Sequence, residues 1–425
     1  MLHQTLSQIL TPGSLAAQLS HAAQIIARIR QGESLADGLI QAVPETDRPA
    51  VQEMVYTFLR AYGWADAILA KLLQRPLQDM WLQSLLGLAV LRLFRQSETA
   101  HTIVSQAVDA AAQHDEGRFK ALTNGVLRNF QRQQAELVAS VKQLETVQWA
   151  HPRWWVKHVQ RDHRKTWQSI LRAGNTHPPM ALRVNVRQTT RADWLARATE
   201  AGIEAQAIGA DGVMLTKPVR VSQLPGFFDG DISVQDFGAQ YAAELLNPSV
   251  GARVLDACAA PGGKTAHLLE RTDVALTALD VSPERCQRIE ENLARLKLSA
   301  TVKAADCREI DSWWDKQPFD AILADVPCTA SGVARRHPDS KWLRQESDVN
   351  RFARTQREIL DALSRVLAPG GKLLYVTCSV FTEENQLQIA EYLTRHPEML
   401  LTQEVQLLPN AEHDGFYYAL LTRTA

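Results

Sequence analysis

The sequence predicts a multidomain protein: an all-α domain over residues 1–140, a small α/β module over 141–235 and a doubly wound α/β domain over 236–425. Length is one reason, because a chain of 425 residues is longer than a domain with a single hydrophobic core usually is. A change of pattern is the second, since helical periodicity gives way to alternating strands and helices. The third is a small-residue loop after a predicted strand, which is typical of nucleotide-binding sheets.

Composition and charge limit the class of protein. Hydrophobic residues make up 45% of the chain and charged residues 22%, as in a globular protein. With a net charge of −1, any contact with nucleic acid would depend on local basic patches. The chain has no apolar run near the roughly 18 residues that span a bilayer, and its start lacks a signal-peptide pattern. We therefore expect a cytoplasmic protein without membrane attachment.

The N-terminal part shows helical signals throughout. Ser34, Thr46 and Ser97 stand where helices are expected to begin. Within residues 101–112, one stripe of a helix collects the apolar side chains Val104, Ala107, Val108 and Ala111. Few β-branched alternations occur before residue 140, so we predict an all-α domain.

The middle module begins with a basic helix rich in tryptophan, near His151. Four cations recur at every fourth position and are predicted to share one face: Arg153, Lys157, Arg161 and Lys165. This face is either a solvated surface with the tryptophans in the core, or an RNA-binding surface. Residues 181–186 and 213–215 alternate like strands, which predicts a small α/β fold.

The last part alternates strands with helices, as parallel sheets do. Predicted strands cover 253–257, 274–280, 301–306, 319–325 and 372–377. One helix is predicted to start at Ser282 with a proline at its first turn, and a second is predicted from about Gln356 to the Pro369-Gly370-Gly371 run.

The loop after the first of these strands predicts the ligand. A phosphate loop needs glycine where Cys258 stands, and the dinucleotide pattern is absent. The ligand is therefore expected to be an adenosine compound without phosphates. Predicted contacts come from Ala257, Cys258, Ala259, Ala260, Pro261, Gly262, Gly263 and Lys264.

Three aspartates stand at successive strand ends, where such sheets bind ligands. Asp280 is predicted to accept hydrogen bonds from the ribose hydroxyls, and Asp306 from the adenine amino group. Asp325 is predicted to lie next to the reacting centre.

Two cysteines at strand ends complete the candidate site. Cys328 follows Asp325-Val326-Pro327, and Cys378 lies in Thr377-Cys378-Ser379. A cofactor loop with two thiols predicts methyl transfer to C5 of a pyrimidine, which is a poor nucleophile until a thiolate adds to C6. The five cysteines form no C-x-x-C pair, so neither disulfides nor a metal is expected.

Residues 256–265, with the Asp325–Cys328 and Thr377–Ser379 segments, resemble the S-adenosylmethionine-dependent RNA cytosine-C5 methyltransferases. The Val234-Gln235-Asp236 run and the Asp414-Gly415-Phe416-Tyr417 run match them as well. The helical domain is similar to the antitermination factor NusB. This fusion resembles one subgroup, the bacterial enzymes that methylate 16S ribosomal RNA, and the resemblance covers nearly the whole chain.

The resemblance implies a NusB-like domain, a Rossmann-like catalytic domain, S-adenosylmethionine as cofactor and small-subunit ribosomal RNA as partner, with cytosine 967 as the target. It implies that Cys378 adds to C6, that Cys328 assists removal of the C5 proton and that Asp325 contacts the base. Arg335 and Arg336 are expected either to contact a phosphate or to lie in a solvated loop. We expect a monomer.

Other readings stay open at this point. DNA cytosine-C5 methyltransferases use the Pro-Cys thiol, which would make Cys328 the nucleophile. The substrate is alternatively a transfer RNA or 23S ribosomal RNA. A third alternative is a non-catalytic RNA-binding or antitermination protein, in which the helical domain carries the function.

Overall fold

The computed structural model describes residues 10–424, which form two compact units. The first unit runs to Arg161 and also takes in His337–Arg344; the second comprises Asp162–Arg336 and the chain from Gln345 onward. Residues 1–9 of the predicted helical domain lie outside the described part of the chain.

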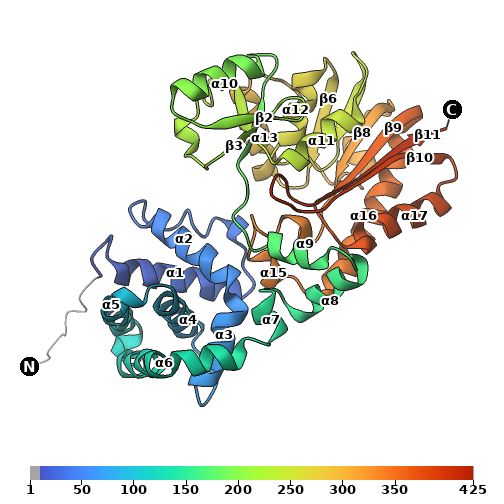
Figure 1. Cartoon of the computed structure of the whole chain (residues 1–425). Helices are drawn as coiled ribbons and strands as arrows, with labels where there is room; N and C mark the ends of the chain where they lie inside the picture. The colour runs from blue at the N-terminus through green and yellow to red at the C-terminus, as the bar shows by residue number, and fades with distance from the viewer. Residues whose placement is uncertain (1–9, 425) are drawn as a thin grey trace, which may run out of the picture. The chain divides into compact units, whose positions relative to one another are not determined.

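The first unit is all-helical, as predicted (Figure 1). Its core is built from the apolar faces of the longer helices, with fully buried side chains such as Leu19, Leu85 and Phe130. Ser34 caps a short 3-10 helix as predicted, whereas the carboxylate of Asp47, before α2, accepts from the backbone N–H of Gly13 instead of capping its own helix. The main helices are α1 (Leu15–Arg30), α2 (Arg48–Arg60), α3 (Tyr62–Leu72), α4 (Met80–Arg95), α5 (Ala100–Gln113), α6 (Lys120–Val141), α7 (Glu145–Gln148) and α8 (Arg153–Asp162).

A short helix from much later in the sequence, α15 (Ser340–Leu343), also belongs to the first unit. The Trp342 ring stacks on Tyr62 with ring centroids 4.7 Å apart, and its indole N–H donates to the carbonyl of Leu59. The carboxylate of Asp339 accepts from the hydroxyl of Ser34 at 2.9 Å. The segment His337–Arg344 is therefore anchored in the helical unit, which the sequence did not predict.

The small module of the second unit is a four-stranded antiparallel sheet with the order β2-β3-β1-β4. Trp194 of α10 (Arg191–Glu200) is fully buried against it. The predicted strands at 181 and 213 are confirmed. The strands are β1 (Ala181–Val184), β2 (Ala205–Ile208), β3 (Gly212–Leu215) and β4 (Ile232–Val234).

The prediction that four cations share one face of the basic helix is wrong for Lys165. Helix α8 stops at Asp162, so Lys165 lies in the turn before α9 (Trp167–Ala173). The carboxylate of Asp162 accepts from the N–H of Thr382, and the imidazole of His163 contacts the Val380 carbonyl at 2.6 Å. These contacts hold the chain at the point where the helix ends.

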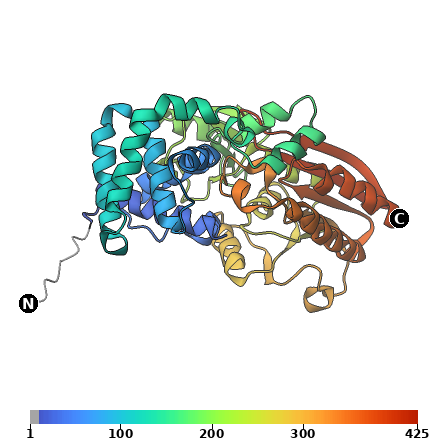
Figure 2. The ribbon, with the colours of Figure 1, turned by 90° about the horizontal axis from the view of Figure 1, so that it is seen from below.

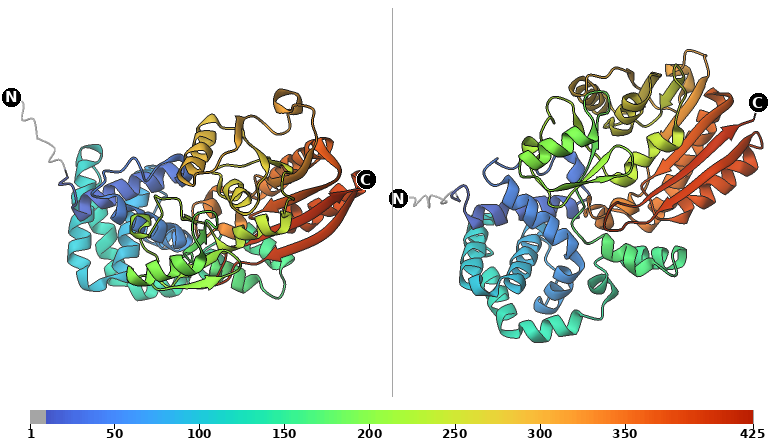
Figure 3. Two further views of the ribbon diagram at one scale, coloured as in Figure 1. Left: turned by 90° about the horizontal axis from the view of Figure 1, so that it is seen from above. Right: turned by 45° about the horizontal axis from the view of Figure 1, so that its top comes forward.

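The last domain has the predicted doubly wound architecture, with a seven-stranded sheet of order β10-β11-β9-β8-β5-β6-β7. The first five strands in sequence pair in parallel, and the last two form an unpredicted antiparallel edge (Figure 3). The strands are β5 (Arg253–Asp256), β6 (Ala275–Asp280), β7 (Thr301–Ala304), β8 (Phe319–Asp325), β9 (Leu367–Thr377), β10 (Met399–Leu407) and β11 (Phe416–Arg423).

Helices cover both faces of this sheet. Helices α14 (Ile310–Trp313), α16 (Glu346–Val366) and α17 (Gln386–Arg395) pack on one face of the sheet, and Figure 2 shows α16 and α17 there. The opposite face is covered by α11 (Phe237–Leu246), α12 (Gly263–Arg271) and α13 (Pro283–Arg295). Ser282 and Pro283 begin α13 as predicted, but α16 begins at Glu346, well before the predicted Gln356. Within residues 10–424, every helix is too short or too polar to cross a bilayer.

Candidate active site

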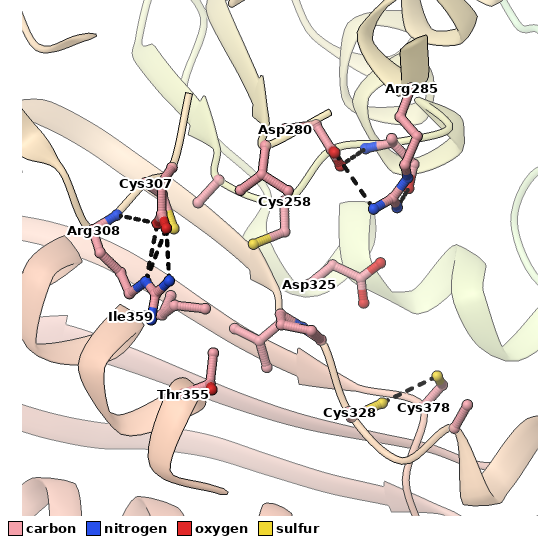
Figure 4. Close-up of a pocket in the computed structure, with 17 residues that line it drawn as sticks. Cys258, Asp280, Arg285, Cys307, Arg308, Asp325, Cys328, Thr355, Ile359 and Cys378 are labelled. Carbon is pink, nitrogen blue, oxygen red and sulfur yellow. Dashed lines mark hydrogen bonds and ion pairs between the residues drawn. The ribbon is translucent and has the colours of Figure 1, made fainter. Parts of the chain in front are cut away.

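A pocket of about 390 Å³ opens at the carboxyl ends of the parallel strands (Figure 4). Each strand contributes side chains from the residues that follow it, because parallel strands end at the same edge of a sheet. The structure brings together there the predicted Ala257, Cys258, Ala260, Asp280, Asp306, Asp325, Cys328 and Cys378. In the described chain, no cluster of three or more His, Cys, Asp or Glu side chains is arranged to hold a metal.

The loop between β5 and α12 forms one wall of this pocket. Gly262 has a φ of +93°, and a Cβ there would lie 3.2 Å from Ile289, so a side chain at this position would be strained and crowded. Five predicted cofactor contacts do not line the pocket: Ala259, Pro261, Gly262, Gly263 and Lys264. They shape the loop instead, and the small residues that do line it leave space for a ligand.

Asp256, the last residue of β5, is hydrogen-bonded to α12 on the other side of the loop. Its side chain is buried, and one carboxylate oxygen accepts from the hydroxyl of Thr265 at 2.7 Å. Burial raises the pKa of Asp256 to about 7, since a charge there loses its hydration.

The aspartates after β6 and β7 have arginine partners that the sequence reasoning missed. Asp280 accepts from the N–H groups of Ser282 and Ala260, and its carboxylate lies 3.4 Å from the guanidinium of Arg285. Asp306 pairs with Arg308 at 2.7 Å, and hydrogen bonds from that guanidinium lower the pKa of Asp306. Both arginines line the pocket, so each carboxylate presents a partly satisfied acceptor to a ligand.

The sulfur atoms of Cys328 and Cys378 lie 3.3 Å apart. Strands β8 and β9 are neighbours, with Asp325 opposite Val376, so the two loops leave the sheet side by side. The hydrogen bond with the Cys378 thiol, together with burial, raises the pKa of Cys328. The predicted convergence of the two thiols on one cleft is thus present in the structure.

A lysine and an aspartate lie beside the thiols. The ammonium group of Lys264 is 2.6 Å from the carboxylate of Asp325 and 5.6 Å from the centre of the Phe416 ring. Burial alone would lower the pKa of Lys264, but the attraction of Asp325 outweighs it and the pKa is raised. A positive charge therefore lies next to Asp325, which lines the pocket.

Two other cysteines also line the pocket, and these form a second thiol pair. A hydrogen bond with the Cys307 thiol raises the pKa of Cys258, and burial adds to this rise. Cys286 lies apart, buried on α13 with its thiol directed at the carbonyl of Asp280. Its buried position on α13 indicates a packing role.

The expectation of a solvated loop is wrong for Arg335, and contact of Arg335 and Arg336 with a phosphate stays a prediction. Arg335 is 2% exposed, and both guanidinium groups hydrogen-bond to the carboxylate of Asp414. Arg336 also pairs with Asp236 at 2.6 Å. Arg336 therefore links the Asp236 and Asp414 segments, and Arg335 is anchored on Asp414.

Sequence reasoning missed a buried polar network behind the two thiols. Its centre is Glu384, which is fully buried and accepts hydrogen bonds from Thr329, Ser379 and Gln356. A glutamate six positions after Cys378, within a polar run, has no local signal of burial. Only the tertiary fold reveals its position.

Comparisons with known proteins agree with this architecture. Residues 243–422 match the family described as 16S rRNA methyltransferase RsmB/F, residues 151–222 match the ferredoxin-like domain of RsmF/B-like methyltransferases, and residues 17–132 match the NusB family. The predicted NusB-like and Rossmann-like parts are confirmed, and the middle module is ferredoxin-like.

Curated relatives and solved structures are similar to most of the chain. Ribosomal RNA small subunit methyltransferase B of Cronobacter sakazakii is 41% identical over 421 residues, which cover 95% of this chain and 98% of the relative. The crystal structure of PH0851 has a TM-score of 0.80 at 24% identity over 95% of this chain and 98% of that one. A methyltransferase homolog from Pyrococcus horikoshii has a TM-score of 0.59 at 26% identity over 65% and 97%. The chain belongs to the ribosomal RNA small subunit methyltransferase B family, enzymes of the RsmB/F group that methylate 16S ribosomal RNA.

Proposed function

We propose that the protein transfers a methyl group from S-adenosylmethionine to C5 of a cytosine in 16S ribosomal RNA, through a transient bond between Cys378 and C6. The observation that carries this proposal is the pair of thiols, 3.3 Å apart, at a pocket that is also lined by Asp325, the ion-pair partner of Lys264. Cytosine 967 is the proposed target, on the family relationship alone. Bisulfite sequencing of 16S ribosomal RNA from a deletion strain tests that position.

The pocket suits S-adenosylmethionine. Val281 and Ile359 supply apolar surface for an adenine ring, and Asp280 stands where a ribose would be bound. Small residues in the loop after β5 leave the backbone accessible to the ligand. When bound, this group supplies an electrophilic methyl for transfer to carbon.

The chain's own residues prepare the base for this transfer. The Cys378 thiolate attacks C6, which makes C5 nucleophilic. Cys328 releases its own proton to solvent, and after methyl transfer its thiolate takes the proton from C5. The C6–S bond then breaks, the aromatic ring is restored and Cys378 leaves as a thiolate. Asp325, held by Lys264, is placed to contact N3 or the amino group of the cytosine.

Labelled S-adenosylmethionine and 16S ribosomal RNA test the activity. The native chain is expected to transfer label to cytosine, and Cys378→Ala is expected to lose transfer while still binding the cofactor. Cys286→Ala is the matched control, because this thiol lies outside the pocket and is expected to leave transfer intact. Transfer at the native rate by Cys378→Ala would contradict the proposed nucleophile.

We also propose that the exposed cations of α8 contribute to RNA binding. Arg153, Lys157 and Arg161 are all exposed, at a spacing that places them on one face of the helix. Reversing all three charges is expected to weaken binding of 16S ribosomal RNA and flatten its salt dependence, with cofactor affinity unchanged. Charge reversal at Lys71 and Arg75, which are exposed elsewhere, is the control. Equal effects of the two sets of changes would contradict a specific role for α8.

A further inference from the structure

The two cysteine loops share one buried carboxylate. Glu384, at the end of the 3-10 helix Thr382–Glu384, accepts from the backbone N–H of Thr329 at 2.8 Å and also from its hydroxyl. It also accepts from the hydroxyl of Ser379 at 2.5 Å. Thr329 follows Cys328 in sequence and Ser379 follows Cys378, so a single side chain holds the residue next to each thiol.

Neighbouring side chains fix this carboxylate in turn. The amide of Gln356 donates to Glu384 at 3.1 Å and to the carbonyl of Pro327 at 3.0 Å. The hydroxyl of Tyr375 donates to the Glu384 carbonyl and to the Gln356 side chain. Hydrogen bonds to a buried carboxylate are strong, so the network resists changes in the spacing of the two loops.

The charges around the two thiols are unequal. On the side of Cys328 lie Glu384 and the phenol of Tyr375, and the Glu384 charge adds to the hydrogen bond and burial that raise the pKa of Cys328. On the side of Cys378 lie the ammonium of Lys264 and the phenol of Tyr418. Two carboxylates also attract the ammonium of Lys264: Asp325, which forms an ion pair with it, and the buried Asp256.

We infer that Glu384 is a positioning residue that sets the spacing of the two thiols and keeps their shared proton on Cys328, so that the thiolate forms on Cys378. A negative charge behind Cys328 opposes a second negative charge there, whereas the ammonium of Lys264 favours one on Cys378. The Cys328 S–H then donates to the thiolate 3.3 Å away. The role of this arrangement in methyl transfer rests on the proposed function. The difference in protonation between Cys328 and Cys378 does not depend on that function.

Alkylation of the full-length protein by iodoacetamide tests the inference without methyl transfer. Mass spectrometry of peptides gives the modification rates of Cys328 and Cys378 separately, from pH 6 to 9.5. In the native chain Cys378 is expected to react faster than Cys328 throughout this range. In Glu384→Gln, which keeps the side-chain shape, Cys328 is expected to react about tenfold faster at pH 8. The control Glu391→Gln, on the exposed face of α17, is expected to behave as the native chain.

Glu384→Asp keeps the charge and provides a second test. It is expected to retain the preference for Cys378, and a preference lost as fully as in Glu384→Gln would overturn the proposed electrostatic role. An unchanged pH profile of Cys328 in a folded Glu384→Gln chain would overturn it as well. A chain that shows the predicted thiol difference but transfers no methyl would leave this inference standing and remove the proposed function.

Discussion

Arg183 on β1 and Glu270 on α12 form a buried ion pair, with the guanidinium Nε 2.6 Å from the carboxylate. Strand β1 belongs to the ferredoxin-like module, and α12 carries the cofactor loop at its start. The same guanidinium donates to the carbonyl of Gly263, the first residue of α12. The module after the helical unit therefore helps to position the loop that is proposed to bind the cofactor.

Replacing Glu270 with leucine is expected to destabilise the second unit. The change leaves the Arg183 guanidinium buried without its opposite charge, which costs about 3–5 kcal/mol in comparable cases. Urea unfolding measures this loss, and calorimetric titration with S-adenosylmethionine is expected to show weaker binding. The control Glu284→Leu removes an exposed pair with Arg288 and is expected to cost less than about 1 kcal/mol. Similar losses for the two variants would contradict the role given to the buried pair.

Lys341 gives the first unit a pH-dependent stability. It is fully buried, its ammonium donates to the carbonyl of Ala150 at 3.0 Å, and burial lowers its pKa from 10.5 to about 7, with the charge of Arg60 adding to the effect. Between pH 7 and 10.5 the unfolded chain binds a proton that the folded chain lacks, so stability rises with pH in this window. Below pH 7 both states are protonated, and the cost of burying the charge is complete.

Lys341→Met is expected to remove this rise and to stabilise the first unit most at pH 7 and below. Thermal unfolding followed by circular dichroism from pH 6 to 10 measures the difference. Lys71→Met, at an exposed position on α3, is the matched control and is expected to keep the native pH dependence. Parallel pH profiles for the native chain and Lys341→Met would contradict a lowered lysine pKa.

Trp342→Ala is expected to release the α15 segment from the helical unit. The change removes the stacking on Tyr62 and the indole hydrogen bond to Leu59, a loss of about 3 kcal/mol. Limited proteolysis within residues 337–344 is expected to become faster. Trp342→Phe keeps an aromatic ring against Tyr62, so its proteolysis rate is expected to lie between those of the native chain and Trp342→Ala. Unchanged proteolysis in the alanine variant would show that other contacts hold the segment.

Local sequence patterns were sufficient for the five parallel strands and for the residues at their ends, but not for β10 and β11. Asp256, Asp280 and Asp325 each follow an apolar run, and the glycine-containing loop marks where a ligand is expected. These signals are local, since alternation and turn residues depend on neighbours in sequence. The pairing of Cys328 with Cys378 needs two strands to be adjacent, and here the family resemblance supplied what periodicity does not.

The residues that sequence reasoning misplaced depend on contacts far apart in the chain. In the sequence, Arg335 and Arg336 resemble a phosphate-binding pair. In the fold, both guanidinium groups pair with Asp414, in the loop before β11. Glu384 lies in a polar run that is typical of an exposed turn, yet the fold buries it behind the thiols. The α15 segment packs on helices about three hundred positions earlier in sequence, as the bond between Asp339 and Ser34 shows. Burial of charge depends on the partners that tertiary structure provides.

The covalent step is tested most directly by trapping it. Cys328→Ala, incubated with S-adenosylmethionine and 16S ribosomal RNA, is expected to accumulate a protein–RNA complex that survives a denaturing gel, because Cys378 adds to the base but the C5 proton is not removed. Cys378→Ala and the double variant are expected to form none. Normal turnover by Cys328→Ala without any such complex would contradict the roles assigned to the two thiols.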